Sequence, residues 1–165
     1  MSGSSGTRMT IARTKMRPLM LSRAQVRDVR TQFGAFCYRI RQDKPQVLLV
    51  TSRGSGRWII PNGWPVPGAT PTEAALREAW EEAGVEGRVM GNALGIYSYI
   101  KVDDGTHLPC VVAVFPIRVK RISKLYPEAG QRRRKWSSLK KAAALVDEPE
   151  LRQMIRDFDP GVLPG

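Results

Sequence analysis

Residues 77–85 read Arg-Glu-Ala-Trp-Glu-Glu-Ala-Gly-Val. Three carboxylates, those of Glu78, Glu81 and Glu82, fall at positions i, i+3 and i+4 of this stretch. On a helix with about 100° between successive residues, these positions share one stripe. Like charges this close destabilise a helix unless a cation lies between them. The stretch therefore predicts a divalent metal site on one side of a helix.

The helix itself is predicted over residues 71–83. Its start fits a capping box, with Thr70 as N-cap, Pro71 in the first turn and Glu73 reaching back to the cap. Gly84 suits the residue just past the last turn. The glutamate stripe is expected to face a cleft or solvent, and the opposite side is expected to face the core. The residues of that core side are Leu76, Ala79, Trp80 and Ala83.

An ordinary solvated acidic face is the alternative interpretation of the three glutamates. Such a face normally has Lys or Arg interleaved to relieve the repulsion, and here only Arg77 does so. Upstream, residues 61–68 form a Gly- and Pro-rich segment, which allows the backbone to approach a ligand closely. The combination of loop, capped helix and three carboxylates favours the metal site.

The segment from Gly63 to Val85 resembles the Nudix box, whose pattern is Gly, five residues, Glu, seven residues, then Arg-Glu-apolar-any-Glu-Glu-any-Gly-apolar. Ala69 stands where the pattern has its first glutamate, and this is a departure. The resemblance extends over roughly residues 30–158 and implies a Nudix-like α/β/α sandwich with a mixed central sheet. The matching positions are Gly63, Arg77, Glu78, Ala79, Glu81, Glu82, Gly84 and Val85.

The fold class predicted from the order of the elements is also α/β, in a single domain over residues 31–160. A turn at residues 103–105 predicts a hairpin between its flanking strands. The segment 88–101 is interpreted as one long strand or a strand pair. Extended segments are predicted at residues 32–40, 46–51, 57–60, 88–101, 108–119 and 133–137, and helices at 71–83, at 138–146 and from Pro149 to about 158.

Residues 1–30 are predicted to lie outside this domain. The first six resemble an expression scar, and the remainder is a basic, flexible arm in which Asp28 is the only acid. No apolar run approaches 18 residues, so no membrane span is expected. Cys37 and Cys110 lie in apolar stretches, which predicts buried thiols in a reducing compartment. We expect a cytoplasmic protein, with a transit peptide as the alternative.

The chain carries 27 Lys and Arg against 15 Asp and Glu, a formal net charge of +12. Nine of the basic residues fall between positions 120 and 141, where Glu128 is the single acid. An excess of this sign predicts a polyanionic partner, and a phosphorylated small molecule is favoured over nucleic acid. A solvated surface is the alternative. The candidates for holding the substrate and its phosphates are Arg39, Arg53, Gly63, Arg132, Arg133 and Arg134.

The resemblance to the Nudix box also implies roles. Glu78 and Glu82 are expected to ligate Mg²⁺, with Mn²⁺ as a possible substitute, and the Gly63 backbone is expected at the metal-bound phosphate. Glu81 is the general base or a third ligand. Glu128 is a candidate base from outside the box, and its alternative role is a local ion pair with Arg132. Such a metal neutralises charge on a diphosphate and activates a water for attack in line with the leaving group.

A further resemblance concerns residues 130–136, which read Gly-Gln-Arg-Arg-Arg-Lys-Trp. The segment is similar to one in diphosphoinositol polyphosphate phosphohydrolases, a subgroup that also hydrolyses dinucleoside polyphosphates. This implies Mg²⁺-dependent hydrolysis of a diphosphate linkage in a highly phosphorylated substrate. The alternatives are an RNA 5′ pyrophosphohydrolase and a non-catalytic module that binds polyanions. His107 is expected on the surface, and stacking on a base or packing is expected for Trp64, Tyr97 and Tyr99.

Overall fold

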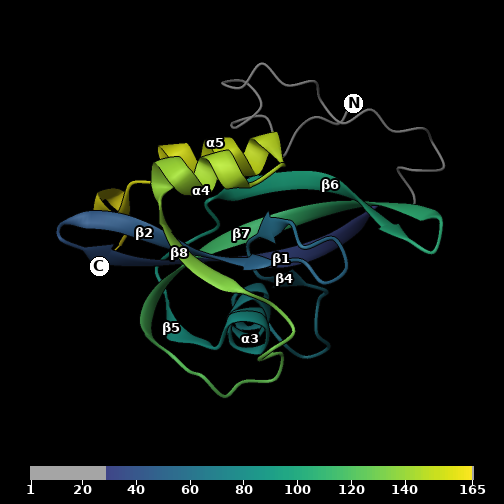
Figure 1. The fold of residues 1–165 in the computed structure, drawn as a ribbon, viewed down its shortest axis with the longest axis horizontal. Helices are drawn as coiled ribbons and strands as arrows, with labels where there is room; N and C mark the ends of the chain where they lie inside the picture. The colour runs from purple at the N-terminus through teal and green to yellow at the C-terminus, as the bar shows by residue number, and fades with distance from the viewer. Residues whose placement is uncertain (1–28, 165) are drawn as a thin grey trace.

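A computed structural model describes residues 29–164 (Figure 1). The predicted expression scar, and the basic arm up to residue 28, lie outside the described residues. The fold is built on an eight-stranded sheet with the order β3-β2-β1-β7-β5, in which β4, β6 and β8 pair with β1, β7 and β2. The β1–β7 pair is parallel and the other pairs are antiparallel, so the sheet is mixed. The strands are β1 (Arg30–Arg41), β2 (Lys44–Thr51), β3 (Trp58–Ile59), β4 (Asn62–Gly63), β5 (Val85–Val89), β6 (Gly95–Asp103), β7 (Thr106–Ile122) and β8 (Arg134–Ser138).

Helices cover both faces of the sheet. Helix α3 (Pro71–Ala83) packs on one face, and α4 (Leu139–Leu145) and α5 (Pro149–Asp157) pack on the other (Figure 1). A short 3-10 helix, η1 (Pro160–Val162), follows. This arrangement confirms the predicted α/β/α sandwich with a mixed central sheet. Of the described helices, none is long and apolar enough to cross a membrane.

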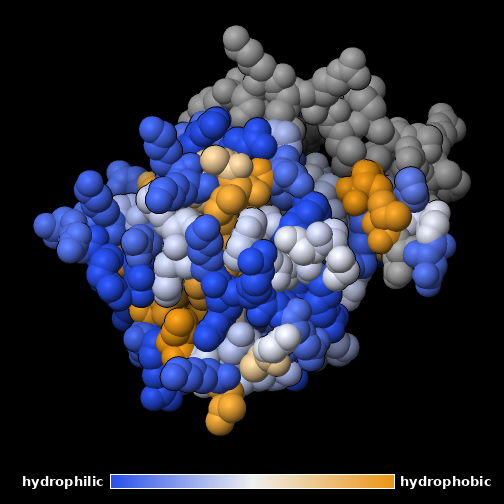
Figure 2. All heavy atoms as spheres, in the orientation of Figure 1, coloured by the Kyte–Doolittle hydropathy of each residue, from blue (hydrophilic) through white to orange (hydrophobic). Residues whose placement is uncertain are grey.

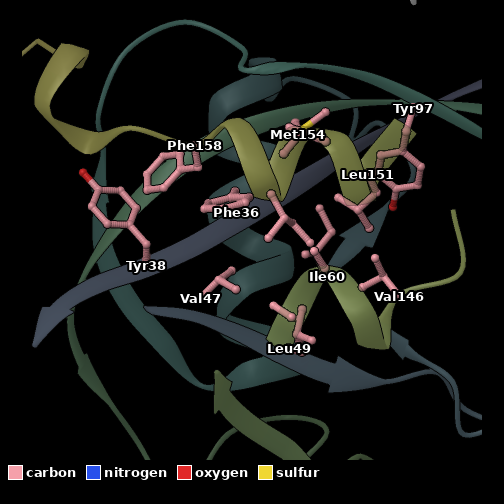
Figure 3. Packing of buried hydrophobic residues seen from close by; sticks show 14 of the residues in the cluster. Phe36, Tyr38, Val47, Leu49, Ile60, Tyr97, Val146, Leu151, Met154 and Phe158 are labelled. Atoms are coloured by element: carbon pink, nitrogen blue, oxygen red, sulfur yellow. The ribbon is translucent and has the colours of Figure 1, made fainter. Parts of the chain in front are cut away.

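Each face of the sheet has its own core. The larger core lies beneath α4 and α5, and Figure 3 shows Phe158 against Phe36 and Tyr38 of β1. The smaller core lies beneath α3. Successive residues of β1 alternate between these two cores, as a strand between two helical layers requires.

Helix α3 has the predicted ends. Thr70 Oγ1 accepts from Glu73 N at 3.2 Å, Thr70 N donates to Glu73 Oε1 at 2.8 Å, and Gly84 takes the left-handed conformation with φ 66°. The buried side of the helix is formed mainly by small side chains, which let its axis approach the sheet closely. Trp80, predicted on this side, is only half-buried. Fully buried residues facing the sheet are Ala75, Ala79 and Ala83.

The extended stretch 88–101 is a pair of strands, which is one of the two predicted alternatives, and its first member, β5, begins earlier than predicted, at Val85 directly after α3. Strand β4 was not predicted, because an Asn-Gly pair in a Pro-rich loop has little strand preference of its own. It forms because Gly63 pairs with Phe33 of β1, which holds the loop in front of α3. The predicted hairpin of β6 and β7 is confirmed.

Candidate active site

A cleft of about 800 Å³ opens beside the end of α3. Its lining comes from β1, the segment before α3, α3 itself, β6 and the loops after β2 and β7. Its charges are balanced. Four cations line it, on Arg53, Arg57, Lys101 and Arg132, and so do four carboxylates, on Glu78, Glu82, Glu128 and Glu148.

Glu78 and Glu82 face this cleft from successive turns of α3. Glu82 is 5% exposed, and its Oε1 accepts from the backbone N of Asn62 at 3.3 Å. Gly63 lies so close to Glu78 that an added β-carbon would collide with the Glu78 carboxylate. The backbone of β4 and the two carboxylates therefore enclose one compact, oxygen-rich end of the cleft, which we call the glutamate end.

Burial shifts the protonation of both carboxyls. Loss of solvent raises the pKa of Glu82 to about 8; the Arg132 guanidinium opposes this rise, and the neighbouring Glu78 carboxylate adds to it. Burial likewise raises the pKa of Glu78, and the charges of Glu81 and Glu128 contribute in the same direction. An additional cation at this end would favour the ionised forms.

Glu81 does not line the cleft. Its Oε2 accepts from Arg77 Nε at 3.2 Å on the outer side of the helix. The reason is rotation along the helix, since positions 81 and 82 point about 100° apart. Glu81 thus lies outside the cleft lining, and its role as general base or metal ligand stays a prediction. Ala69, where the Nudix box pattern has glutamate, does not line the cleft either.

Arg132 joins the loop after β7 to the glutamate end. Its side chain is 7% exposed, and its Nη2 lies 3.5 Å from Glu82 Oε2. Its Nε donates to Glu128 Oε1 at 2.7 Å, and its Nη1 donates to the backbone O of Thr51 at 3.0 Å. The ion pair considered for Glu128 is therefore present, and because Glu128 also lines the cleft, its role as a base stays a prediction.

The glutamate end fits a hard divalent cation with few protein ligands. In residues 29–164, no group of three or more His, Cys, Asp or Glu side chains is arranged to hold a metal ion. Glu82 offers a buried carboxylate and Glu78 a half-buried one, and the absence of a side chain at Gly63 lets the Glu78 carboxylate lie against the backbone. Mg²⁺ binds in this way, through one or two carboxylates together with substrate phosphates and water. Glu78, Glu82 and the Gly63 backbone are the residues that would hold it.

The arginines predicted to bind substrate divide into two groups. Arg53 and Arg132 line the cleft. The other three contact aromatic rings and do not line the cleft, and their binding of substrate phosphates stays a prediction. In each case the guanidinium carbon Cζ lies over an aromatic ring. The distance from Cζ to the ring centroid is 4.1 Å for Arg39 over Trp136, 5.2 Å for Arg133 over Trp58 and 4.8 Å for Arg134 over Tyr126.

The cleft also contains residues that the sequence interpretation missed. Gln32 is buried, and its Oε1 accepts from Tyr99 Oη at 2.7 Å. Glu148, the N-cap of α5, accepts from Arg57 Nη1 at 2.8 Å. A polar residue at position 32, where the alternation of β1 calls for an apolar one, was the available signal. The exposed His107 lies on the β6–β7 hairpin, as expected.

Known proteins resemble this chain in sequence. Residues 30–158 match the family described as the Nudix domain. Nudix hydrolase 13, mitochondrial, of Arabidopsis thaliana is 28% identical over 123 residues, which are 71% of this chain and 61% of that protein. Diphosphoinositol polyphosphate phosphohydrolase 2 of Homo sapiens is 41% identical over 64 residues, 39% of this chain and 35% of that protein. The chain thus spans less than two thirds of the length of these relatives.

The fold has counterparts among solved structures. A Nudix hydrolase from Nitrosomonas europaea superposes with a TM-score of 0.62 at 21% identity, covering 82% of this chain and 91% of that one. This likeness concerns the fold, and the sequence match covers the glutamate helix together with the sheet around it. The chain therefore belongs to the Nudix hydrolase family.

Proposed function

We propose that this protein hydrolyses a diphosphate linkage in a phosphorylated substrate, with Mg²⁺ held at the glutamate end of the cleft. The observation that supports this most directly is that the buried Glu82 carboxylate and the half-buried Glu78 carboxylate both line the cleft beside the backbone of Gly63. Relatives named for diphosphoinositol polyphosphates support the same chemistry. Dinucleoside polyphosphates contain the same type of linkage, and we include them in the proposed substrate class.

The residues of the cleft have different proposed roles. Glu78 and Glu82 hold the cation, which supplies positive charge at the diphosphate and activates a water. Arg53 is our choice for binding the phosphates that do not react, since it lines the cleft and a guanidinium can form paired hydrogen bonds to phosphate oxygens. Arg132 positions Glu82 and Glu128 through its ion pairs with both. Glu128 is our choice for accepting the proton of the attacking water, because it lines the cleft and Glu81 does not.

Phosphate release tests this proposal. The substrates are diadenosine tetraphosphate, a diphosphoinositol polyphosphate and 5′-triphosphorylated RNA, each with Mg²⁺ and with a chelator. We expect Mg²⁺-dependent turnover of at least one of the first two. Glu78→Gln and Glu82→Gln should each lower kcat/KM by at least about a hundredfold, because each removes charge from the cation site. Glu86→Gln is the matched control, since Glu86 pairs with Arg121 on the surface.

Each alternative gives a different result. Turnover that survives chelation, or that both glutamine variants leave intact, contradicts the proposal. Turnover of the RNA alone would identify an RNA 5′ pyrophosphohydrolase. Tight binding without turnover of any substrate would identify a module that binds polyanions.

A further inference from the structure

Two arginines face each other across neighbouring strands at a distance from the cleft. Arg88 of β5 and Arg118 of β7 are direct cross-strand partners, and Arg118 is also in register with Tyr38 of β1. We call these three residues the arginine site. Gln32, which lines the cleft, lies earlier in the same strand as Tyr38, and at about 3.3 Å per residue the stretch between them spans about 20 Å. The arginine site is therefore separate from the glutamate end.

Both arginines point to the face of the sheet that carries α4 and α5. Side chains alternate in direction along a strand, and the adjacent Val89 and Val119 pack against the core beneath α3. Tyr38 belongs to the core on the opposite face, and Figure 3 shows its hydroxyl turned away from Phe36 and Phe158. The two guanidiniums and this hydroxyl thus gather at one end of the larger core.

The contacts that orient the two arginines are with uncharged groups. Arg88 Nε donates to Met90 Sδ at 3.4 Å. Burial raises the pKa of Tyr38, and the charge and hydrogen bond of Arg118, together with the charge of Arg88, oppose this rise. Both guanidiniums therefore act on the hydroxyl, which can accept from an arginine and donate to another group at the same time.

The charges of Arg88 and Arg118 are not neutralised by the protein. Both residues are exposed, and neither forms an ion pair with another residue of the range 29–164. Like charges directly opposite each other on neighbouring strands destabilise a sheet. The same two strands avoid this cost at another cross-strand pair, where Arg121 donates to both carboxylate oxygens of Glu86, each at 2.9 Å. An anion between Arg88 and Arg118 would compensate them in the same way.

The surroundings of the arginine site favour an anion. Lys120 follows Arg118 on the same face of β7 and is exposed. The acids at the end of α5, which covers this face, have other partners, since Asp157 accepts from Gln153 and Asp159 caps η1. Figure 2 shows hydrophilic side chains at the left of the view, over the end of the sheet where β1 turns into β2, and a hydrophobic patch at the β6–β7 hairpin.

We propose that the arginine site binds a phosphate group with two negative charges, either free phosphate or a phosphate monoester, at a place separate from the cleft. Two guanidiniums balance a dianion, and each can form paired hydrogen bonds to its oxygens, while the Tyr38 hydroxyl can donate to another. A phosphodiester or a carboxylate has a single charge and compensates only half of the pair. The proposal does not depend on the hydrolase function, because neither arginine lines the cleft.

Nuclear magnetic resonance of the full, isotope-labelled chain tests this at the level of single residues. Inorganic phosphate is titrated at about pH 7.5, where it is mainly dianionic, in the absence of Mg²⁺. We expect saturable shifts of the Nε–H signals of Arg88 and Arg118, with a Kd on the order of 1 mM. Sodium chloride at the same ionic strength should not reproduce them. Equal shifts in chloride, or phosphate-dependent shifts confined to cleft residues such as Gly63, would overturn the proposal.

Single substitutions assign the binding to these side chains. Arg88→Gln and Arg118→Gln should each weaken phosphate binding at least about fivefold, because each removes one of the two charges. Tyr38→Phe keeps the buried ring and removes only the hydroxyl, so a loss of about threefold is expected. Arg121→Gln is the matched control, since it removes a charge from the same strand that Glu86 already neutralises. Equal weakening by the control would mean a general effect of net charge and would overturn the proposal.

Two further probes distinguish the sources of the phosphate. Methyl phosphate is a monoester, and dimethyl phosphate is a diester with one charge, which should bind at least about fivefold more weakly than inorganic phosphate. Tighter binding of methyl phosphate than of inorganic phosphate supports a monoester as the natural ligand, and the reverse order supports free phosphate. Dimethyl phosphate that binds as tightly as either would overturn the proposal and indicate the backbone of a nucleic acid. Failure of the hydrolase function would leave these titrations unchanged.

Discussion

Gly63 shows how a single missing side chain shapes the glutamate end. The backbone of β4 passes so close to the end of the Glu78 side chain that a β-carbon has no room. Glu78 can turn away because its carboxylate is the end of a flexible chain, whereas the backbone of β4 is fixed by its pairing with Phe33. A larger residue at position 63 should therefore displace the carboxylate and leave the fold intact.

Gly63→Ala should lower Mg²⁺ affinity by at least about tenfold, a loss typical of a misplaced ligand. The thermal midpoint should stay close to that of the wild type, because only one flexible side chain must move. Calorimetric titration with Mg²⁺ and a thermal melt in chelator measure the two quantities. Pro67→Ala, in the same loop, is the control. Unchanged affinity would show that the position of Glu78 does not matter for the cation.

Glu82 makes the stability of the metal-free protein depend on pH. Its pKa is about 8 in the folded state, above the ordinary 4.5 that applies to the unfolded chain. The folded state thus retains a proton that the unfolded state has lost. The contribution to stability is complete below about pH 4.5 and disappears as pH rises through 8, at about 1.4 kcal/mol for each pKa unit.

We therefore expect the chelator-treated wild type to lose unfolding free energy between pH 5 and about 8, on the order of a few kcal/mol at most. Glu82→Gln has no ionisable group at this position, so the unfolding free energy of this variant should vary less over the same pH range. Urea unfolding at several pH values compares the two proteins. Parallel curves for both would show that Glu82 ionises normally in the fold.

The arginine run 132–134 shows that residues adjacent in sequence can take different roles where a loop enters a strand. Arg132 and Arg133 precede β8, and Arg134 is its first residue. Arg132 reaches the cleft, Arg133 lies on Trp58, and Arg134 lies on Tyr126. Their shared charge suggested a shared ligand, whereas each side chain has a different partner.

Arg134 holds the end of α3. Its Nη1 donates to the backbone O of Ala83 and of Ser123, both at 2.8 Å. Arg134→Lys should lower the free energy of unfolding by about 1–2 kcal/mol, because an ammonium cannot keep the stacking on Tyr126 together with both bonds. KM should not change. Arg53→Lys should do the opposite, raising KM without loss of stability; denaturant melts and steady-state kinetics separate the two.

Elements whose signals are local were predicted well. The capping box and Gly84 mark both ends of α3 within the helix itself, and the turn before β7 marks its hairpin. The position of β4 and the outward turn of Glu81 depend on partners elsewhere, namely β1 and Arg77. Helical periodicity predicts which side chains lie on the same side of α3. It does not predict which of them form an ion pair, as Glu81 does with Arg77.

At the scale of the whole molecule, the excess of positive charge lies outside the cleft. The chain has a net charge of +12, whereas the four cations and four carboxylates of the cleft cancel. The sequence predicted the charge and the fold class. It could not place Gln32 and Glu148 in one cleft, because the two are distant in the chain and only the complete sheet and the beginning of α5 bring them there.

This distribution predicts two responses to salt. Binding of a long polyanion such as heparin should weaken steeply between about 50 and about 200 mM salt, because it depends on the summed surface charge. The kcat/KM for a small diphosphate substrate should change much less, since the cleft is electrically balanced. Heparin binding and kcat/KM are measured in parallel at both salt concentrations. An equal salt dependence of heparin binding and of kcat/KM would contradict this prediction, because it would mean that the surface charges outside the cleft also determine substrate binding.

Arg57 and Glu148 connect the loop before β3 to the beginning of α5, whereas Glu78 and Glu82 belong to α3. The lining of the cleft is thus encoded by separate stretches of the chain. Substitutions in the loop before β3 or at the beginning of α5 would leave the residues of α3 unchanged. Such separation would let related proteins come to accept different ligands while they keep the same glutamate helix.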